Sequence, residues 1–98
     1  MGESPAALRA VVRGRVQGIG FRDYVLTRAG FLGLTGYVRN LPDGRSVEIV
    51  AEGARPDLEQ LLDYLREGPR MSRIDAVDAE WREATGAYER FGVGFTRS

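Results

Sequence analysis

The chain has 98 residues, of which 43% are hydrophobic, and its 14 basic residues balance 14 acidic ones. This length suits one domain with one core, and no apolar run is long enough to span a bilayer. The balanced charge does not favour nucleic-acid binding, which usually needs a positive surplus or a basic run. The N-terminus lacks the pattern of a signal peptide, so we expect a cytoplasmic protein without membrane contact.

Cysteine, histidine and lysine are all absent from the sequence. Their absence excludes disulfides, thiolate nucleophiles, Cys/His metal sites, a histidine base and a lysine Schiff base. An enzyme of this composition must work with arginine, carboxylates, amides, hydroxyls and backbone groups.

The first third of the chain predicts a flexible start, a strand, a loop and a helix. Residues 1–7 are expected to be a flexible N-terminus, followed by a domain of residues 8–98. Apolar residues alternate over 8–13, which is the period of a strand. They then follow helical spacing from Phe21 to about residue 32, and Gly33 predicts the cap that ends this helix.

The remainder predicts a hairpin, a second helix and two further strands. The hairpin joins strands at 35–40 and 47–52 through the turn sequence Leu-Pro-Asp-Gly. A helix follows Pro56 with a leucine stripe that is typical of core packing, and Gly68 with its following proline ends it. Alternation then predicts strands at 77–81 and 91–95.

This order of elements predicts an α+β fold, the ferredoxin-like α/β sandwich. Its βαββαβ order gives an antiparallel sheet with both helices on one face, because the crossovers are right-handed. A short extra C-terminal strand completes it. Since this fold carries many functions, the function must come from a site.

A candidate anion cradle lies between the first strand and the first helix. The segment Gly14–Arg22 holds three glycines, whose backbone N–H groups can approach a bound group closely. The helix that follows directs the positive end of its dipole at the loop. Taken alone, such a loop is more often a simple turn than a phosphate site.

Two segments resemble the signatures of the acylphosphatase family. Gly-Arg-Val-Gln-Gly-Ile-Gly-Phe-Arg at 14–22 is similar to the first, with Ile19 where valine is usual. Gly-Tyr-Val-Arg-Asn-Leu-Pro-Asp-Gly at 36–44 is similar to the second. Ser46 stands where the family pattern has valine, which predicts a hairpin turn one residue longer.

The resemblance implies hydrolysis of acyl phosphates to a carboxylate and phosphate, with neither metal nor cofactor. It implies that Arg22 binds the substrate phosphate and that Asn40 positions the attacking water. The implied phosphate-binding backbone comprises Val16, Gln17, Gly18, Ile19, Gly20 and Phe21. The implied partners are a small acyl phosphate and, as product or inhibitor, inorganic phosphate or another anion. Nothing in this chemistry needs more than a monomer.

Other interpretations of the same residues remain open at this point. Arg22 alone would be read as a surface charge, and Asn40 alone as a residue that starts the turn. The same fold and anion site would also serve a non-catalytic regulatory module that binds phosphate or acyl phosphates. A single-stranded nucleic-acid binder is a third reading, but paired stacking aromatics are not evident on the central strands.

Overall fold

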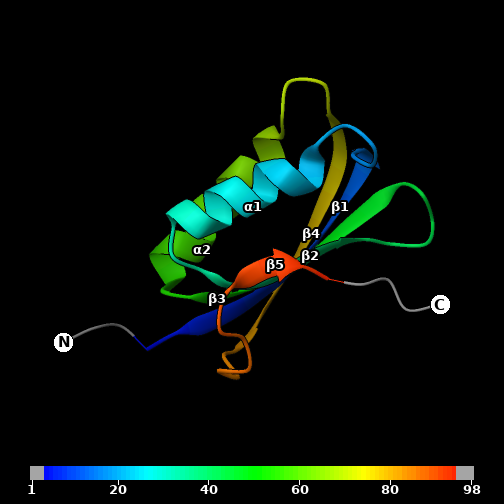
Figure 1. The fold of residues 1–98 in the computed structure, drawn as a ribbon. Helices are drawn as coiled ribbons and strands as arrows, with labels where there is room; N and C mark the ends of the chain where they lie inside the picture. The colour runs from blue at the N-terminus through cyan, green and yellow to red at the C-terminus, as the bar shows by residue number, and fades with distance from the viewer. Residues whose placement is uncertain (1–3, 95–98) are drawn as a thin grey trace.

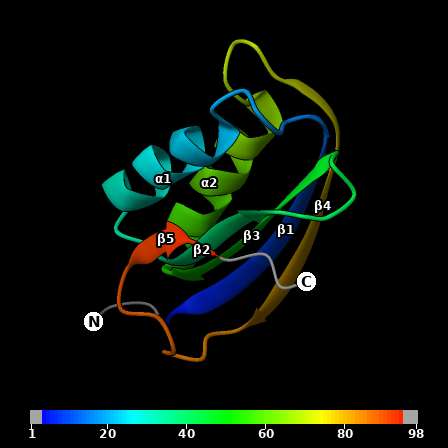
Figure 2. The ribbon, with the colours of Figure 1, turned by 45° about the vertical axis from the view of Figure 1, so that its right-hand side comes forward.

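The structure, a computed structural model, describes residues 4–94 of the chain. These residues form a sheet covered on one face by two helices (Figures 1 and 2). In chain order the elements are β1 (Ala6–Arg15), α1 (Phe21–Phe31), β2 (Thr35–Asn40), β3 (Ser46–Gly53), α2 (Arg55–Glu67), β4 (Arg73–Glu83) and β5 (Phe91–Val93).

The sheet has the strand order β4-β1-β3-β2-β5. Its first four strands pair antiparallel, and both helices lie on one face, so the predicted ferredoxin-like sandwich is confirmed. The short fifth strand differs from its neighbours, because β5 runs parallel to β2 and makes the whole sheet mixed. The predicted antiparallel description therefore holds for four strands and not for the fifth.

The core lies between the sheet and the helices. Alternate residues of β1 and β3 point into it, and the leucine stripe of α2 is buried against them, as its spacing predicts. These fully buried side chains include Leu8, Val12, Val47, Ile49, Leu58, Leu61 and Leu65. The two helices are also tied together, because the hydroxyl of Tyr24 donates to the carbonyl oxygen of Tyr64 at 2.9 Å.

Several element boundaries differ from those that periodicity predicts. β1 begins at Ala6, within the segment expected to be flexible, because Ala6 pairs with β3 on one side and β4 on the other. β4 extends well beyond 77–81, because it pairs with β1 along almost the whole length of that strand. Phe95, expected in the last strand, lies outside the described residues.

The first helix ends as the sequence predicts. The N–H of Gly33 bonds to the carbonyl of Gly30, and the N–H of Leu34 bonds to that of Ala29. This pair of bonds is a Schellman motif, which satisfies carbonyls that the helix end would otherwise expose. Neither of the two described helices is long and apolar enough to cross a membrane.

Candidate active site

The loop of residues 16–20 connects the end of β1 to the start of α1. Gly18 and Gly20 adopt φ angles of 74° and 80°, in the left-handed region that other residues rarely enter. Gly20 is also the N-cap of α1, and no side chain caps this helix end. The glycines therefore turn the chain so that bare backbone, uncapped by any side chain, leads into the helix.

This bare backbone concentrates hydrogen-bond donors. In the part of the chain that the structure describes, residues 16–20 donate none of the backbone hydrogen bonds found in loops and caps. The first N–H groups of α1 also lack helical acceptors, as at any helix start. Together with the positive end of the helix dipole, these donors make the local field favourable for an anion.

A pocket of about 350 Å³ opens beside these donors. It brings together the start of α1, the end of β2 and the end of β5. Its lining comprises Val16, Gly18, Gly20, Phe21, Arg22, Asp23, Asn40 and Val93. Arg22 and Asn40, which are 18 positions apart in the chain, thus line one space.

Not every residue proposed from the sequence lines this pocket. Six of the eight do, whereas Gln17 and Ile19 are absent from the lining. Ile19 instead packs against the hydrophobic core. The side chain of Gln17 is used to hold the loop in place.

Gln17 ties the loop to the β2–β3 hairpin. Its Nε2 donates to the carbonyl oxygens of Leu41 at 2.9 Å and of Ser46 at 2.8 Å. These two carbonyls lie at the two ends of the hairpin turn, and Leu41 directly follows Asn40. One amide group therefore fixes the distance between the donor-rich loop and the strand end that carries Asn40.

The hairpin turn is stiffened from inside by Asp43. Its carboxylate accepts hydrogen bonds from the N–H groups of Arg45 and Ser46, both at 2.9 Å, and from the Ser46 hydroxyl at 2.6 Å. The Ser46 hydroxyl is the main cause that holds the pKa of Asp43 below its usual value. Ser46 is fully buried, so the residue that departs from the family pattern has a structural partner within the turn.

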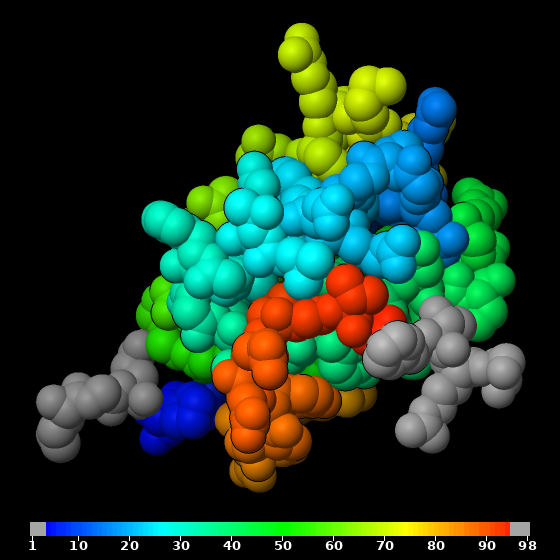
Figure 3. All heavy atoms as spheres, in the orientation of Figure 1, coloured from blue at the N-terminus to red at the C-terminus, as the bar shows by residue number. Residues whose placement is uncertain are grey.

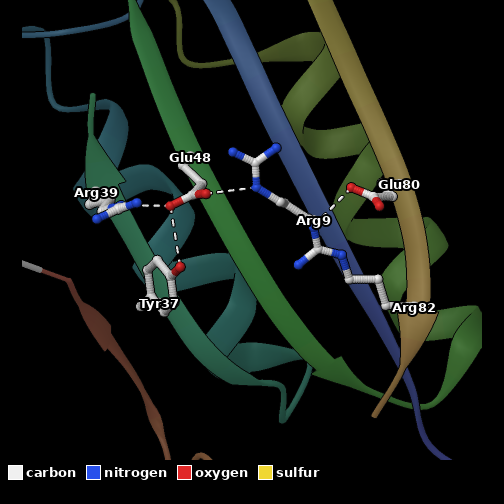
Figure 4. A network of polar contacts seen from close by, with 6 residues as sticks. All are labelled: Arg9, Tyr37, Arg39, Glu48, Glu80 and Arg82. Atoms are coloured by element: carbon white, nitrogen blue, oxygen red, sulfur yellow. Dashed lines mark hydrogen bonds and ion pairs between the residues drawn. The ribbon is translucent and has the colours of Figure 1, made fainter. Parts of the chain in front are cut away.

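The strand end that carries Asn40 is anchored on the opposite face of the sheet (Figure 4). The buried carboxylate of Glu48 accepts from Nε of Arg9 at 2.7 Å, from Nε of Arg39 at 2.6 Å and from the Tyr37 hydroxyl at 3.2 Å. Burial raises the pKa of Glu48, but the two arginines outweigh it and hold that pKa below its ordinary value. Because successive strand residues point to opposite faces, fixing Arg39 on this face directs Asn40 toward the helices.

Two lining residues escaped the sequence analysis. Asp23 lies in the first turn of α1 and belongs to neither the proposed catalytic pair nor the proposed phosphate-binding loop. Val93 was seen only as a strand residue, and its place in the pocket depends on the parallel pairing of β5 with β2. α1 and β5 contact each other, and Figure 3 shows the red end of β5 lying against the blue start of α1.

A larger cavity of about 660 Å³ lies on the other side of the loop. Arg15, Arg45 and Arg73 line it, together with Gln17, but neither Arg22 nor Asn40 does. We therefore assign the candidate site to the smaller pocket, where the loop donors, a cation and an amide converge. Among residues 4–94 there is no group of three or more metal-ligating side chains placed to hold a metal ion.

Comparison with known proteins places the chain in a family. A family model described as Acylphosphatase matches residues 8–93, nearly the whole described chain. The chain belongs to the acylphosphatase family. The match includes both segments that form the pocket around Arg22 and Asn40.

Individual members of the acylphosphatase family are similar over most of their length. An acylphosphatase of Thermus thermophilus is 52% identical over 79 residues, covering 81% of this chain and 89% of that protein. One from Dehalococcoides mccartyi is 46% identical over 86 residues, covering 88% and 94%. The crystal structure of acylphosphatase from Bacillus subtilis superposes with a TM-score of 0.87 at 33% identity, covering 92% of this chain and 99% of that one.

Proposed function

We propose that this chain is an acylphosphatase, which hydrolyses acyl phosphates to a carboxylate and inorganic phosphate. The observation that carries the proposal is the single pocket in which Arg22, Asn40 and the donor-rich loop meet. That pocket lies in a chain of the acylphosphatase family, and the alternative of a non-catalytic binding module has no observation in its favour.

The phosphate group of the substrate binds at the start of α1. An acyl phosphate carries about two negative charges near neutral pH, by analogy with phosphorylated side chains. The N–H groups of residues 16–21 form a nest for its oxygens, and Arg22 adds a planar fork of donors with a permanent charge. Among the described residues Arg22 forms no ion pair, so its guanidinium is available to an anion.

Asn40 positions the attacking water. Its amide oxygen accepts a hydrogen bond from water and its NH₂ group donates to a phosphate oxygen. The water oxygen then forms a bond to phosphorus as the bond from phosphorus to the acyl oxygen breaks, and the carboxylate departs with that electron pair. One proton of the water passes to a phosphoryl oxygen, which leaves dihydrogen phosphate as the second product. The loop donors and Arg22 stabilise the charge on the phosphoryl oxygens during this step.

The carboxylate is a good leaving group because its conjugate acid is strong, so the step needs little help from a general acid. This suits a chain without histidine, in which the reaction depends on positioning and charge stabilisation. We propose that neither metal nor cofactor takes part. We further propose action as a monomer, because the roles given to these residues need no second chain, and a place in the cytoplasm, because a doubly charged substrate crosses membranes poorly.

The test is hydrolysis of benzoyl phosphate by the purified chain, compared with buffer and with two variants. Arg22→Ala should lose both phosphate binding and turnover, whereas Asn40→Ala should lose turnover while inorganic phosphate still binds. Retention of the full rate by Asn40→Ala would contradict the water-positioning role. Phosphate binding by the unaltered chain without any turnover would favour the regulatory module instead.

A further inference from the structure

We infer that this site selects acyl phosphates whose acyl group is apolar and uncharged. This inference rests on the proposed function and concerns the part of the substrate that leaves. Two residues carry it: Val93 offers an apolar contact to the acyl group, and Asp23 disfavours a second negative charge there. Both line the pocket of Arg22 and Asn40.

Val93 is held at the edge of the pocket by strand pairing. It is the parallel partner of Val38, and the next residue, Gly94, donates its N–H to the carbonyl of Val38 at 2.8 Å. Val38 and Asn40 share one face of β2, since they lie two positions apart. Val93 therefore stands on the helix-covered side of the sheet, beside the strand end that carries Asn40.

Val93 is also unusual in its exposure. It is 48% exposed, whereas its pairing partner Val38 is fully buried. Exposed single apolar side chains are common, but this one lines the same pocket as the polar residues Arg22, Asp23 and Asn40. An aromatic or aliphatic acyl group that leaves the phosphate would cover its methyl groups and remove them from water.

Asp23 sets the charge balance of the pocket. Within residues 4–94, its lining contains one cation, Arg22, and one carboxylate, Asp23. This cation and the loop donors serve the phosphate, so a second anionic group on the substrate would meet a carboxylate and, among the lining residues that the structure describes, no further cation. Repulsion between the Asp23 carboxylate and an anionic acyl group disfavours binding of that substrate. Proteins use such repulsion to reject competing ligands.

The helix dipole offers a simpler role for Asp23, and the structure provides a matched control for it. Asp23 and Asp57 each lie third in their helices, α1 and α2, within the first turn. Asp57 is absent from the lining of the pocket. If only the dipole mattered, replacing either residue by asparagine would alter stability and leave substrate preference unchanged.

The experiment compares kcat/KM for three substrates: acetyl phosphate, benzoyl phosphate and 4-carboxybenzoyl phosphate. The last two have nearly the same shape and differ by one carboxylate. The unaltered chain should prefer benzoyl phosphate to both others. Val93→Ser should lower the ratio of benzoyl to acetyl phosphate by about threefold, as expected for losing part of one apolar contact. Met71→Ser, at an exposed apolar residue that lines the other cavity, is the control.

Asp23→Asn should reduce the discrimination between benzoyl and 4-carboxybenzoyl phosphate by about three- to tenfold at low salt, as expected for one partly screened charge pair. Asp57→Asn should leave that ratio unchanged. Ratios that do not move in Val93→Ser and Asp23→Asn, or that move equally in the controls, would overturn the inference. Failure of the proposed function would look different, because no acyl phosphate would then be hydrolysed at all.

Discussion

Gln17 does not line the pocket, yet we expect its replacement to impair turnover. Gln17→Met keeps the length of the side chain and removes both donors, so the carbonyls of Leu41 and Ser46 lose the group that joins them. The loop of residues 16–20 and the strand end of Asn40 then lose their shared tether. Catalysis that depends on positioning is sensitive to such a change, since a displacement of about 1 Å can lower a rate by about 100-fold.

The expected loss of stability follows from the two hydrogen bonds. A neutral hydrogen bond contributes about 0.5–1.5 kcal/mol net, so two contribute about 1–3 kcal/mol. Both carbonyls keep another donor, because Leu41 accepts from the Gly44 N–H at 3.3 Å and Ser46 accepts from the Leu41 N–H at 2.9 Å. Because neither carbonyl is left wholly unsatisfied, we expect Gln17→Met to lower the unfolding free energy by about 1–2 kcal/mol, in the lower part of that range.

Two measurements test this reasoning together. Urea unfolding gives the loss of stability, and kcat and KM for benzoyl phosphate give its effect on the site. We expect kcat to fall by about tenfold or more, as displacement of a positioned group implies. Gln17→Glu should be worse than Gln17→Met in both measurements, because it turns a carboxylate toward two carbonyl oxygens. Gln60→Met, at an exposed position of α2, is the matched control.

The reasoning would be refuted in two separable ways. If Gln17→Met behaved like Gln60→Met in urea, the two hydrogen bonds would contribute nothing to the fold. If Gln17→Met lost stability but kept kcat, the tether would support the hairpin without aligning Asn40 with the loop.

Four further outcomes are expected. The pKa values of Glu48 and Glu52 are lowered in the folded chain, so the stability that these carboxylates contribute is present above their ordinary pKa of 4.5 and is lost as the pH falls through the folded pKa values. The unfolding free energy, measured as a function of pH, should show this loss in acid. Glu48→Gln should make the unfolding free energy depend less steeply on pH. At pH 7, Glu48→Gln should also lower the unfolding free energy by about 1–3 kcal/mol, which thermal unfolding would detect. This loss is smaller than is usual for breaking a buried ion pair, because the arginine partners of Glu48 are about one-third exposed. Thr85→Ala should destabilise by about 1 kcal/mol, measured in the same way, since its hydroxyl donates to the Glu52 carboxylate at 2.8 Å. A chelator should leave hydrolysis of benzoyl phosphate unchanged, and loss of the rate with recovery on adding metal would contradict the metal-free proposal.

The fold was largely predictable because its signals are local. The alternation in β1 and the leucine stripe of α2 each follow one structural period, and the turn sequence of the hairpin marks its own reversal. The partner of β5 was not predictable, because three residues carry no information about the strand beside which they lie. The full length of β4 was missed for a related reason: many of its residues are exposed, and pairing with β1 decides its ends.

Only those residues of the candidate site that lie within continuous sequence motifs could be predicted. Arg22 and Asn40 each stand in a distinctive segment, so resemblance to a family identified them before any geometry was known. Asp23 and Val93 stand in no motif, and they join the pocket through the direction of α1 and the pairing of β5. The network around Glu48 was equally hidden, since Arg9 and Arg39 come from different strands and their meeting depends on sheet register.

The order of the strands explains why the site needs a tether at all. The loop leaves β1, Asn40 ends β2, and β3 lies between these two strands in the sheet. The carbonyl groups at the two ends of the β2–β3 turn lie within reach of the loop, and Gln17 uses both. A side chain with a single donor could bond to only one of these two carbonyls at a time. The two donors of one amide instead hold both ends, so the position of Asn40 relative to the loop depends on the hairpin and the loop together.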